Sequence, residues 1–213
     1  MQRRQIQNIE RILPQSIMVV TLSPRQEPAM AVPPLEALPG SRYAVLADAH
    51  IHPGQTPPFP EGLAAALADV DGILTLGDMG DATGLDTLGA HAPVRGVLGA
   101  DNPNDDPRVP AELRLFSIGG VTLGAVFDGV KHGFLSANDP VAVQPELPEL
   151  LGAAFGRRPD VLLHAASHKA SVTWAAGTLL LNPGGPTLAG IRTLAVLHIE
   201  HGCARVEQVV FQA

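Results

Sequence analysis

Asp48 and His50 follow the apolar run of residues 43–47, and their types and spacing suit them to bind a metal ion. Residues two apart in a strand project on the same side, so this carboxylate and this imidazole would leave the strand end together. Open α/β sheets bind their ligands at the carboxyl ends of their strands. Oxygen and nitrogen donors are a common ligand mix for a catalytic divalent ion. The pair therefore predicts part of a metal site that needs partners from later strands.

Polar side chains also follow the later apolar runs, each where a strand is expected to end. They are Asp78, Asp101 with Asn102, Asp128 and His168. The segment of residues 101–103 is a turn signal, because Asp, Asn and Pro favour turns. His91, His132, His164 and His198 have no motif support and are expected to be structural or exposed.

Elements that position these residues are expected from Arg42 onward. Strands are expected at 43–47, 72–76 and 94–98, a helix is expected at 61–70, and residues 85–88 are expected to be part of a short helix. The second half of the chain favours three hairpins, which pair 113–118 with 121–127, 172–175 with 178–181, and 192–200 with 205–211. A helix is also expected at 147–155, and a strand at 161–164. Alternating α/β followed by antiparallel hairpins predicts two packed mixed sheets with helices outside.

Residues 1–40 differ in composition from the remainder of the chain. A short basic helix is expected over residues 2–13, and five prolines follow between residues 24 and 39. We interpret residues 1–40 as an irregular leader and residues 41–213 as one globular domain.

Charge and cysteine content limit the class of partner. The 213 residues carry a net charge of −7 and show no basic stripe, which argues against extended nucleic acids and anionic membranes as partners. A small substrate is favoured instead. The single cysteine, Cys203, allows no intrachain disulfide and fits a reducing cytoplasm.

The order of these motifs resembles that of the calcineurin-like metallophosphoesterases, most closely the small prokaryotic phosphodiesterases of the YfcE type. The family motifs D-x-H, G-D, G-N-x-D, H-G, G-H-x-H and N-P-G-S correspond to residues 48–50, 77–78, 99–102, 128–129, 165–168 and 182–185. The resemblance covers residues 42–212. It implies an α/β fold, a four-layer αββα sandwich of two mixed sheets, and phosphodiester or phosphomonoester hydrolysis by a metal-bound water.

The resemblance also implies how metal ions are held. The implied ligands of a first ion are Asp48, His50, Asp78 and His168. A second ion would share Asp78, but its other family ligands fall at Ala100, Asp128 and Ala166, of which only Asp128 carries a donor atom. Asn102 stands where the family has an aspartate. We therefore expect one firmly held ion, with Mn²⁺ favoured over Zn²⁺, Fe²⁺, Ni²⁺ and Mg²⁺, and weakened activity, because one ion cannot clamp attacking and leaving oxygens together.

Two other interpretations stay open at this point. Asp48-Ala-His50-Ile-His52 also resembles the D-x-H-x-H opening of amidohydrolase-type barrels, in which His50 and His52 both bind metal. Only about 170 residues follow Tyr43, against about 250 for such a barrel, and the late hairpins also argue against it. Alternatively, a phosphoesterase fold with half a site could serve as an inactive interaction scaffold, as the retromer subunit of this fold does. A homo-oligomer or a protein partner is compatible with these interpretations.

Overall fold

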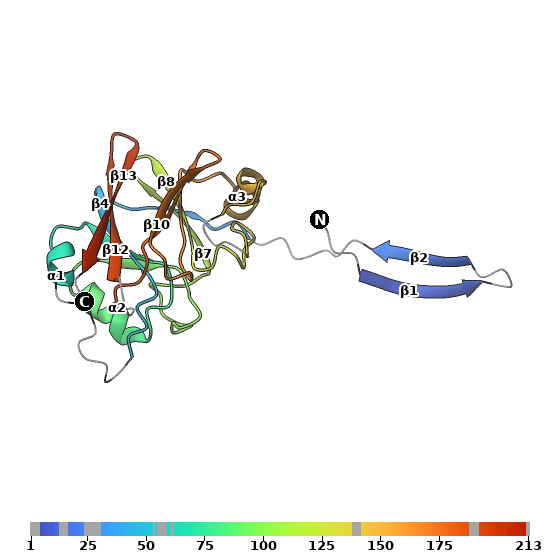
Figure 1. The fold of residues 1–213 in the computed structure, drawn as a ribbon, viewed down its shortest axis with the longest axis horizontal. Helices are drawn as coiled ribbons and strands as arrows, with labels where there is room; N and C mark the ends of the chain where they lie inside the picture. Colours follow the sequence, from blue (N-terminus) through green and yellow to red (C-terminus); the bar gives the residue numbers. More distant parts are fainter. Residues whose placement is uncertain are drawn as a thin grey trace. The chain divides into compact units, whose positions relative to one another are not determined.

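The structure is a computed structural model that describes residues 5–12, 17–23, 31–52, 54, 59–60, 62–137, 142–187 and 192–211. The chain forms two compact units, Met1–Ala31 and Val32–Ala213. In the first unit, β1 (Gln5–Ile12) and β2 (Ile17–Ser23) pair as an antiparallel hairpin (Figure 1). The expected helix is therefore wrong for residues 5–12. Isoleucines in β1 and the β-branched run in β2 favour paired strands over a helix.

The second unit begins earlier than the expected boundary at residue 41. β3 (Leu35–Ala37) pairs in parallel with β7 (Leu113–Ile118) at the edge of a sheet. Residues 35–37 thus belong to the second unit. Because they pair with β7, the expected leader over residues 1–40 overlaps the start of this unit.

One sheet of the second unit has the strand order β13-β12-β4-β5-β6. Its strands are β4 (Arg42–Leu46), β5 (Gly72–Thr75), β6 (Val94–Gly96), β12 (Arg192–Glu200) and β13 (Cys203–Phe211). β4, β5 and β6 are parallel, whereas β12 and β13 form an antiparallel hairpin that pairs with β4. The carboxyl ends of the three parallel strands therefore lie at one edge.

The other sheet has the order β10-β11-β9-β8-β7-β3. Its remaining strands are β8 (Val121–Val126), β9 (Val161–Leu163), β10 (Ser171–Ala175) and β11 (Thr178–Asn182). β8, β9 and β11 are parallel, and antiparallel hairpins add β7 and β10. The sheet is mixed, and the three hairpins predicted from sequence are present.

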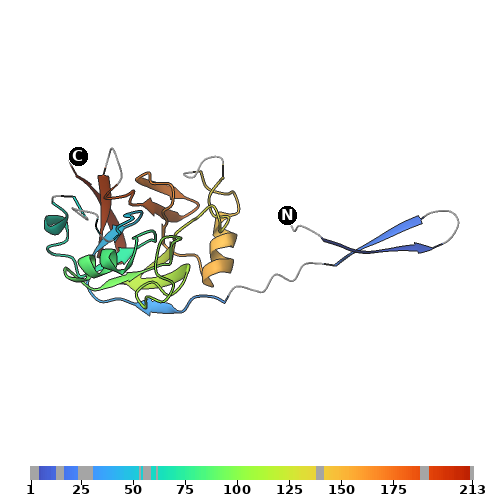
Figure 2. The same ribbon diagram turned by 90° about the horizontal axis from the view of Figure 1, so that it is seen from below.

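The side chains of neighbouring residues alternate between two cores. In β4, Tyr43 and Val45 face a core shared with Phe116 and Leu163 of the other sheet. Ala44 and Leu46 belong to an outer core under two helices, and a third core underlies another helix on the far sheet. The helices are α1 (Leu63–Ala66), α2 (Ala82–Gly89) and α3 (Leu147–Phe155). Figure 2 shows these helices outside the sheets, and the four-layer prediction is confirmed.

α1 differs in length from its prediction, whereas α2 agrees with its prediction. α1 is one turn, because Gly62 enters it with a positive φ of 93° and the residues after Ala66 form a turn. α2 contains residues 85–88 as expected, and it begins at Ala82 because the Asp81 carboxylate accepts a hydrogen bond from the Thr83 amide and caps it. None of the helices in the described part of the chain is long and apolar enough to span a membrane.

Candidate metal centre

The loops after β4, β5 and β6 are joined by hydrogen bonds at the carboxyl end of their sheet. The Asp48 amide donates to the Gly77 carbonyl (3.1 Å), and the His50 amide donates to the Asp78 carbonyl (2.9 Å). The Asp101 amide donates to Oδ1 of Asp78 (2.8 Å). Parallel strands thus deliver three separated segments to one place, which is where open α/β sheets carry their sites.

The close approach of these loops requires glycine. A Cβ placed on Gly99 would lie 2.2 Å from the Asp78 amide nitrogen and 2.5 Å from Oδ1 of Asp78. A Cβ on Gly77 would lie 2.8 Å from the Gly99 Cα. Glycines at both positions therefore let the two loops touch and set the position of the Asp78 carboxylate.

Three of the four predicted ligands gather in one group, and the fourth, Asp78, approaches that group through His50. Asp48, His50 and His168 each offer an atom within 4.8 Å of the others. His168 Nε2 lies 3.6 Å from Asp48 Oδ1, and His50 Nε2 lies 4.0 Å from Asp78 Oδ2. Two atoms that bind one ion at about 2.1 Å each can be at most about 4.2 Å apart. Both separations fit a shared cation.

Asp48 is the electrostatic centre of this group. Its side chain is 0% exposed, and neither carboxylate oxygen has a hydrogen-bond partner of ordinary geometry among the described residues. The pKa of Asp48 is raised to about 7, first by burial and then by the Asp78 carboxylate, against the opposing effects of His50 and the Ala166 backbone. A buried carboxylate of this kind is costly unless a cation or a proton compensates it.

The backbone at the site is strained. Asp48, His50, Asp78, Ala166 and His168 all have positive φ angles, between 47° and 66°. This left-handed region costs an L residue roughly 1–2 kcal/mol, and such residues gather at functional sites. Four predicted ligands adopt it, so the surrounding hydrogen bonds hold these side chains in directions that a regular strand end would not give.

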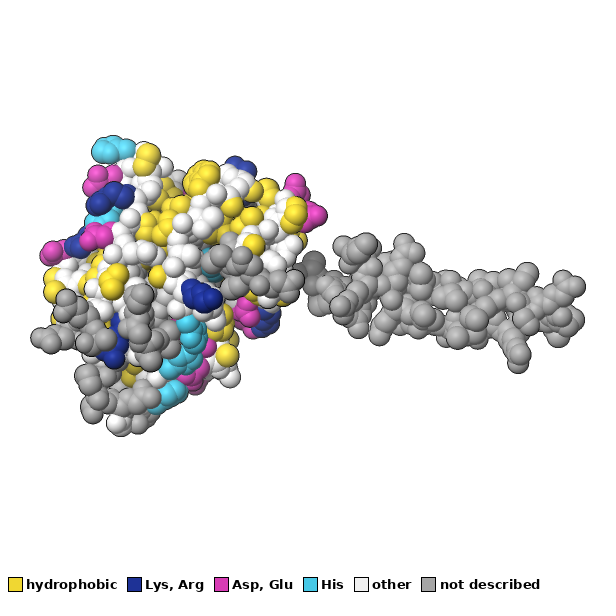
Figure 3. Space-filling view, viewed as in Figure 1, with side chains coloured by type: hydrophobic (Ala, Val, Ile, Leu, Met, Phe, Trp, Pro, Cys, Tyr) yellow, Lys and Arg dark blue, Asp and Glu magenta, His cyan; other side chains and the backbone are white. Residues whose placement is uncertain are grey.

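The carboxylates are buried, whereas the imidazoles reach the surface. The side chains of His50 and His168 are 36% and 44% exposed, and their ring centroids lie 5.7 Å apart. Figure 3 shows histidine side chains next to acidic ones on the surface of the second unit. A ligand arriving from solvent would therefore meet the imidazole side of the group.

Sequence reasoning missed the role of Asp101 and assigned its segment to a turn. Oδ2 of Asp101 lies 2.8 Å from His50 Nδ1 and 3.1 Å from His52 Nε2. The adjacent Asn102 does have the turn role, because its Oδ1 accepts from the Gly99 amide at 3.1 Å. The sequence did hold a signal for this contact: Asp101 follows β6, which pairs in parallel with β5, so its side chain could be expected near the residues that follow β5.

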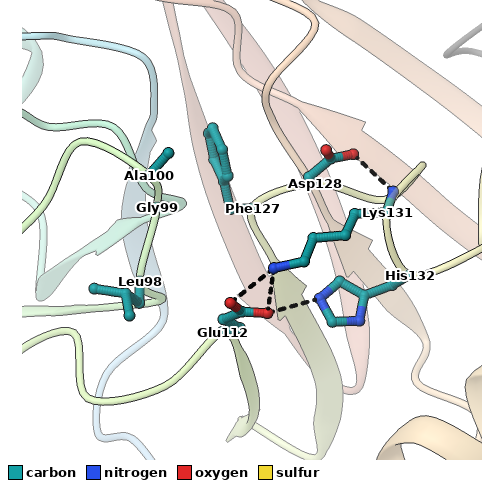
Figure 4. A pocket seen from close by; sticks show the side chains of 8 residues that line it. All are labelled: Leu98, Gly99, Ala100, Glu112, Phe127, Asp128, Lys131 and His132. Atoms are coloured by element: carbon teal, nitrogen blue, oxygen red, sulfur yellow. Dashed lines mark hydrogen bonds and ion pairs between the residues drawn. The ribbon is translucent and has the colours of Figure 1, made fainter. Parts of the chain in front are cut away.

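A cavity of about 180 Å³ is lined in part by Leu98, Gly99 and Ala100 (Figure 4). Gly99 packs closely against Asp78, so the cavity adjoins the candidate ligands. Leu98, Ala100 and Phe127 supply its apolar wall. At its polar end, Lys131 Nζ lies 2.8 and 2.9 Å from the two Glu112 oxygens, and His132 Nε2 lies 3.5 Å from Oε2 of Glu112. Asp128 also lines this cavity and an adjoining one of about 270 Å³ that includes Ala166 and Ser167.

The sequence profile of the calcineurin-like phosphoesterase superfamily domain matches residues 42–202. The chain belongs to this superfamily. The matched segment runs from the start of β4 to the turn between β12 and β13. The family predicted from the order of the motifs is confirmed, and the amidohydrolase-type barrel is wrong because the strands form two sheets instead of a closed parallel barrel.

Individual proteins that resemble this chain in sequence or in structure are consistent with its place in the superfamily. A "Probable metallophosphoesterase" of Methanothermobacter thermautotrophicus is 29% identical over 153 residues, which are 72% of this chain and 81% of the relative. The structure of Vps29 complexed with Zn²⁺ from Entamoeba histolytica is 18% identical with a TM-score of 0.57, covering 80% of this chain and 99% of that one. An archaeal phosphodiesterase is 14% identical with a TM-score of 0.58, covering 80% and 99%. The structural likenesses support the fold, and the superfamily supports a metal-dependent phosphoesterase in general terms.

The positions expected from the motif order to hold a second metal ion carry few donor atoms. Ala100 and Ala166 line cavities and have no ligand atom. Oδ1 of Asp128 accepts hydrogen bonds from the amides of Val130 (2.9 Å) and Lys131 (3.0 Å). Asp128 therefore shapes a turn, and it is absent from the one group of metal-binding side chains found in the described segments.

The remaining polar motif residues have mainly structural roles. Oδ1 of Asn182 accepts from the Gly184 amide at 2.9 Å, which stabilises the predicted turn. His164 is buried, and burial lowers its pKa to about 4. His198 pairs with Glu207 at 3.2 Å. His132 differs from its expected structural role only in that it lines the cavity of Figure 4.

Proposed function

We propose that this member of the superfamily hydrolyses small phosphoesters with one divalent metal ion. The proposed ligands are Asp48, His50, Asp78 and His168. The observation that carries the proposal is the fully buried Asp48 carboxylate. Its oxygens have no hydrogen-bond partner of ordinary geometry among the described residues, and His168 Nε2 lies 3.6 Å from Oδ1. A cation would compensate this buried charge. A divalent ion at such a site supplies polarisation of a phosphoryl oxygen and activation of water.

The proposed ligands would have two different roles, one for the aspartates and one for the histidines. Asp48 and Asp78 lie on the buried side and would balance the charge of the cation. His50 and His168 lie on the exposed side and would border the position of the phosphoryl group. Protonation of any ligand competes with the cation, so binding would weaken as the pH falls.

We propose that the site is mononuclear. Two of the three additional positions for a second ion are alanines, and Asp128 already accepts two amide hydrogen bonds. A carboxylate is a competent ligand for hard cations, so Asp128 remains the one residue through which a weak second ion would bind. Mononuclear chemistry lacks the clamp on both attacking and leaving oxygens, so slow turnover is expected.

We propose Mn²⁺ as the ion. Carboxylates suit Mn²⁺ and Mg²⁺, and imidazoles suit Zn²⁺, Fe²⁺ and Ni²⁺, so the mixed set excludes none of them by chemistry alone. The net charge of −7 favours a small substrate over a long nucleic acid. We further propose a cytoplasmic location, for which the single cysteine is the supporting observation.

Metal analysis and turnover together test the proposal. The protein is incubated with Mn²⁺, Zn²⁺, Fe²⁺, Ni²⁺ or Mg²⁺ and desalted, and bound metal is counted by mass spectrometry. Hydrolysis of bis(p-nitrophenyl) phosphate and of p-nitrophenyl phosphate is then followed. We expect about one Mn²⁺ per chain and measurable turnover, with both lost in His168→Ala, because removing one of four ligands leaves an incomplete site.

His198→Ala serves as the matched control, because it removes a histidine that pairs with Glu207 away from the ligands. It should keep both metal and turnover. Well under one ion per chain, with no hydrolysis, would contradict the enzyme proposal. That result would favour the inactive scaffold, which the two alanines at second-ion positions already make the second candidate.

We also propose that the cavity of Figure 4 receives the organic group of the ester. Its wall of Leu98, Ala100 and Phe127 is apolar, and its far end carries the Lys131–Glu112 ion pair. An apolar group with a polar edge matches such a lining. Ala100 is adjacent in sequence to Asp101, which contacts His50, so the cavity adjoins the metal-binding group.

Filling the cavity tests this placement. Ala100→Phe should raise the KM for bis(p-nitrophenyl) phosphate by about tenfold, corresponding to about 1.4 kcal/mol of lost binding. Mn²⁺ affinity measured by calorimetry should stay within about twofold. Ala111→Phe, which enlarges an exposed alanine outside the cavity, is the control. An unchanged KM in Ala100→Phe would place the organic group elsewhere.

A further inference from the structure

Asp101 connects the metal-binding group to the loop after β6. We infer that Asp101 is a positioning residue that holds the His50 imidazole with Nδ1 protonated and Nε2 turned toward the metal ligands. The inference rests on the proposed metal site. Asp101 stands at the unspecified position of the G-N-x-D motif, so the family resemblance assigns it no role.

The chemistry of the two groups fixes the direction of the hydrogen bond. An ionised carboxylate only accepts hydrogen bonds, so the 2.8 Å contact between Asp101 Oδ2 and His50 Nδ1 requires a proton on Nδ1. In a neutral imidazole, the lone pair then lies on Nε2. Nε2 is the atom that lies 4.0 Å from Asp78 Oδ2. The tautomer that Asp101 selects is therefore the one that can bind a cation.

The backbone of Asp101 is held independently of its side chain. Its amide donates to Asp78 Oδ1 at 2.8 Å, and its carbonyl accepts from the Gly80 amide at 2.9 Å. The first bond leaves Oδ2 of Asp78 on the side of His50. Replacing the Asp101 side chain would keep both bonds, so the loop can persist while the restraint on His50 disappears.

His52 approaches the same carboxylate oxygen. Its Nε2 lies 3.1 Å from Oδ2 of Asp101, and the Ile51 amide between the two histidines donates to the Met79 carbonyl at 3.1 Å. Two imidazoles from one loop thus converge on one acceptor. Because His50 has its own bond to Asp101, loss of His52 should leave the His50 tautomer in place.

Carboxylates that orient metal-binding histidines typically contribute 10–100-fold to metal affinity. The Asp101 carboxylate is 34% exposed, which places the expected loss on Asp101→Ala toward the lower end of that range, about tenfold. Asp101→Asn keeps an oxygen that can accept from Nδ1, so it should restore most of the affinity.

Two measurements on the full chain test the inference. The His50 tautomer is read from long-range ¹H–¹⁵N spectra of metal-free protein at pH 8, with the His50 signals assigned by their loss in His50→Gln. Mn²⁺ affinity is measured by calorimetry. We expect the Nδ1-protonated form in the wild type, in Asp101→Asn and in His52→Ala. Asp101→Ala should shift toward the Nε2-protonated form and bind Mn²⁺ about tenfold more weakly.

Asp105→Ala is the matched control, because it removes an exposed aspartate of the same loop and the same charge. It should change neither measurement. An Asp101→Ala protein that keeps the wild-type tautomer overturns the inference, and so does one whose Mn²⁺ affinity equals that of Asp105→Ala. If Asp101→Ala fails to fold, Asp101→Leu takes its place, because leucine fills a similar volume and offers no acceptor to Nδ1. A shift toward the Nε2-protonated form in Asp101→Leu supports the inference, and a wild-type tautomer with wild-type Mn²⁺ affinity overturns it.

The tautomer is read without metal or substrate, so it separates this inference from the proposed function. A wild type that holds the Nδ1-protonated form but hydrolyses no ester supports the role of Asp101 and contradicts only the proposed activity.

Discussion

Asp48→Asn is expected to abolish tight Mn²⁺ binding and, in the same protein, to stabilise the metal-free fold above pH 7. Asparagine keeps the shape of Asp48 but carries no charge. It therefore removes an anionic ligand that a divalent ion needs, and binding should weaken by at least about 100-fold. It also removes a carboxylate that is buried without hydrogen-bond partners among the described residues.

The sign of the stability change follows from the raised pKa of Asp48. Burial and the Asp78 carboxylate raise this pKa to about 7, whereas an unfolded aspartate titrates near 3.8. The folded protein therefore binds the proton more strongly, and the stability that the protonated group contributes below pH 4 is lost as the pH rises through 7. Asp48→Asn should match the wild type near pH 4 and exceed it at pH 8 by on the order of 2–4 kcal/mol.

Urea unfolding in EDTA at pH 4, 6 and 8 measures this difference, with Asp105→Asn as a control for an exposed aspartate of the same charge. Excess Mn²⁺ should reverse the order, because about 1,000-fold excess over Kd stabilises the wild type alone by about 4.1 kcal/mol. An Asp48→Asn protein that is less stable than the wild type at pH 8 in EDTA would show that the Asp48 charge does not destabilise the folded protein.

Strands and their ends were predictable from the sequence because a short apolar run bounded by polar or turn residues indicates a buried strand. Every residue of β5 is buried, and the hairpin of β7 and β8 turns at Gly119 and Gly120, where a positive φ is needed. Strand ends in turn predicted that Asp48 and Asp78 would lie together, since parallel neighbours end at one edge. These features depend on local sequence and on simple packing.

Features set by contacts between distant segments were not predictable in the same way. The left-handed conformations of Asp48 and His50 accompany hydrogen bonds from their amides to the carbonyls of Gly77 and Asp78 in another loop. The backbone of Asp101 is likewise held by a bond from the Gly80 amide, which belongs to the loop after the preceding strand. The basic composition of residues 2–13 suggested a helix, but pairing with residues 17–23 outweighs helix propensity.

Restoring donor atoms at the second-ion positions is expected to convert the site to a binuclear one. Ala100→Asn with Ala166→His adds an amide oxygen and an imidazole on either side of Asp128, which stays in place to cap its turn. The adjoining cavities of about 180 and 270 Å³ leave room for both new side chains. We expect about two Mn²⁺ per chain and a rise in turnover of bis(p-nitrophenyl) phosphate of at least about tenfold, since a second ion can stabilise the leaving oxygen.

The control must show that a second ion binds because of where the new donor atoms lie, and not merely because donor atoms were added. Ala111→Asn with Ala176→His places the same side chains on two exposed alanines, and Ala176, like Ala166, has a positive φ (50° against 66°). Its backbone strain is therefore matched, yet it should hold no additional ion. Ala100→Asn with Ala166→His that binds only one ion, or binds two without faster turnover, would show that the missing ligands are not what limits this phosphoesterase. A gain in both would instead locate the limit in Ala100 and Ala166, because Asp48, His50, Asp78 and His168 are unchanged.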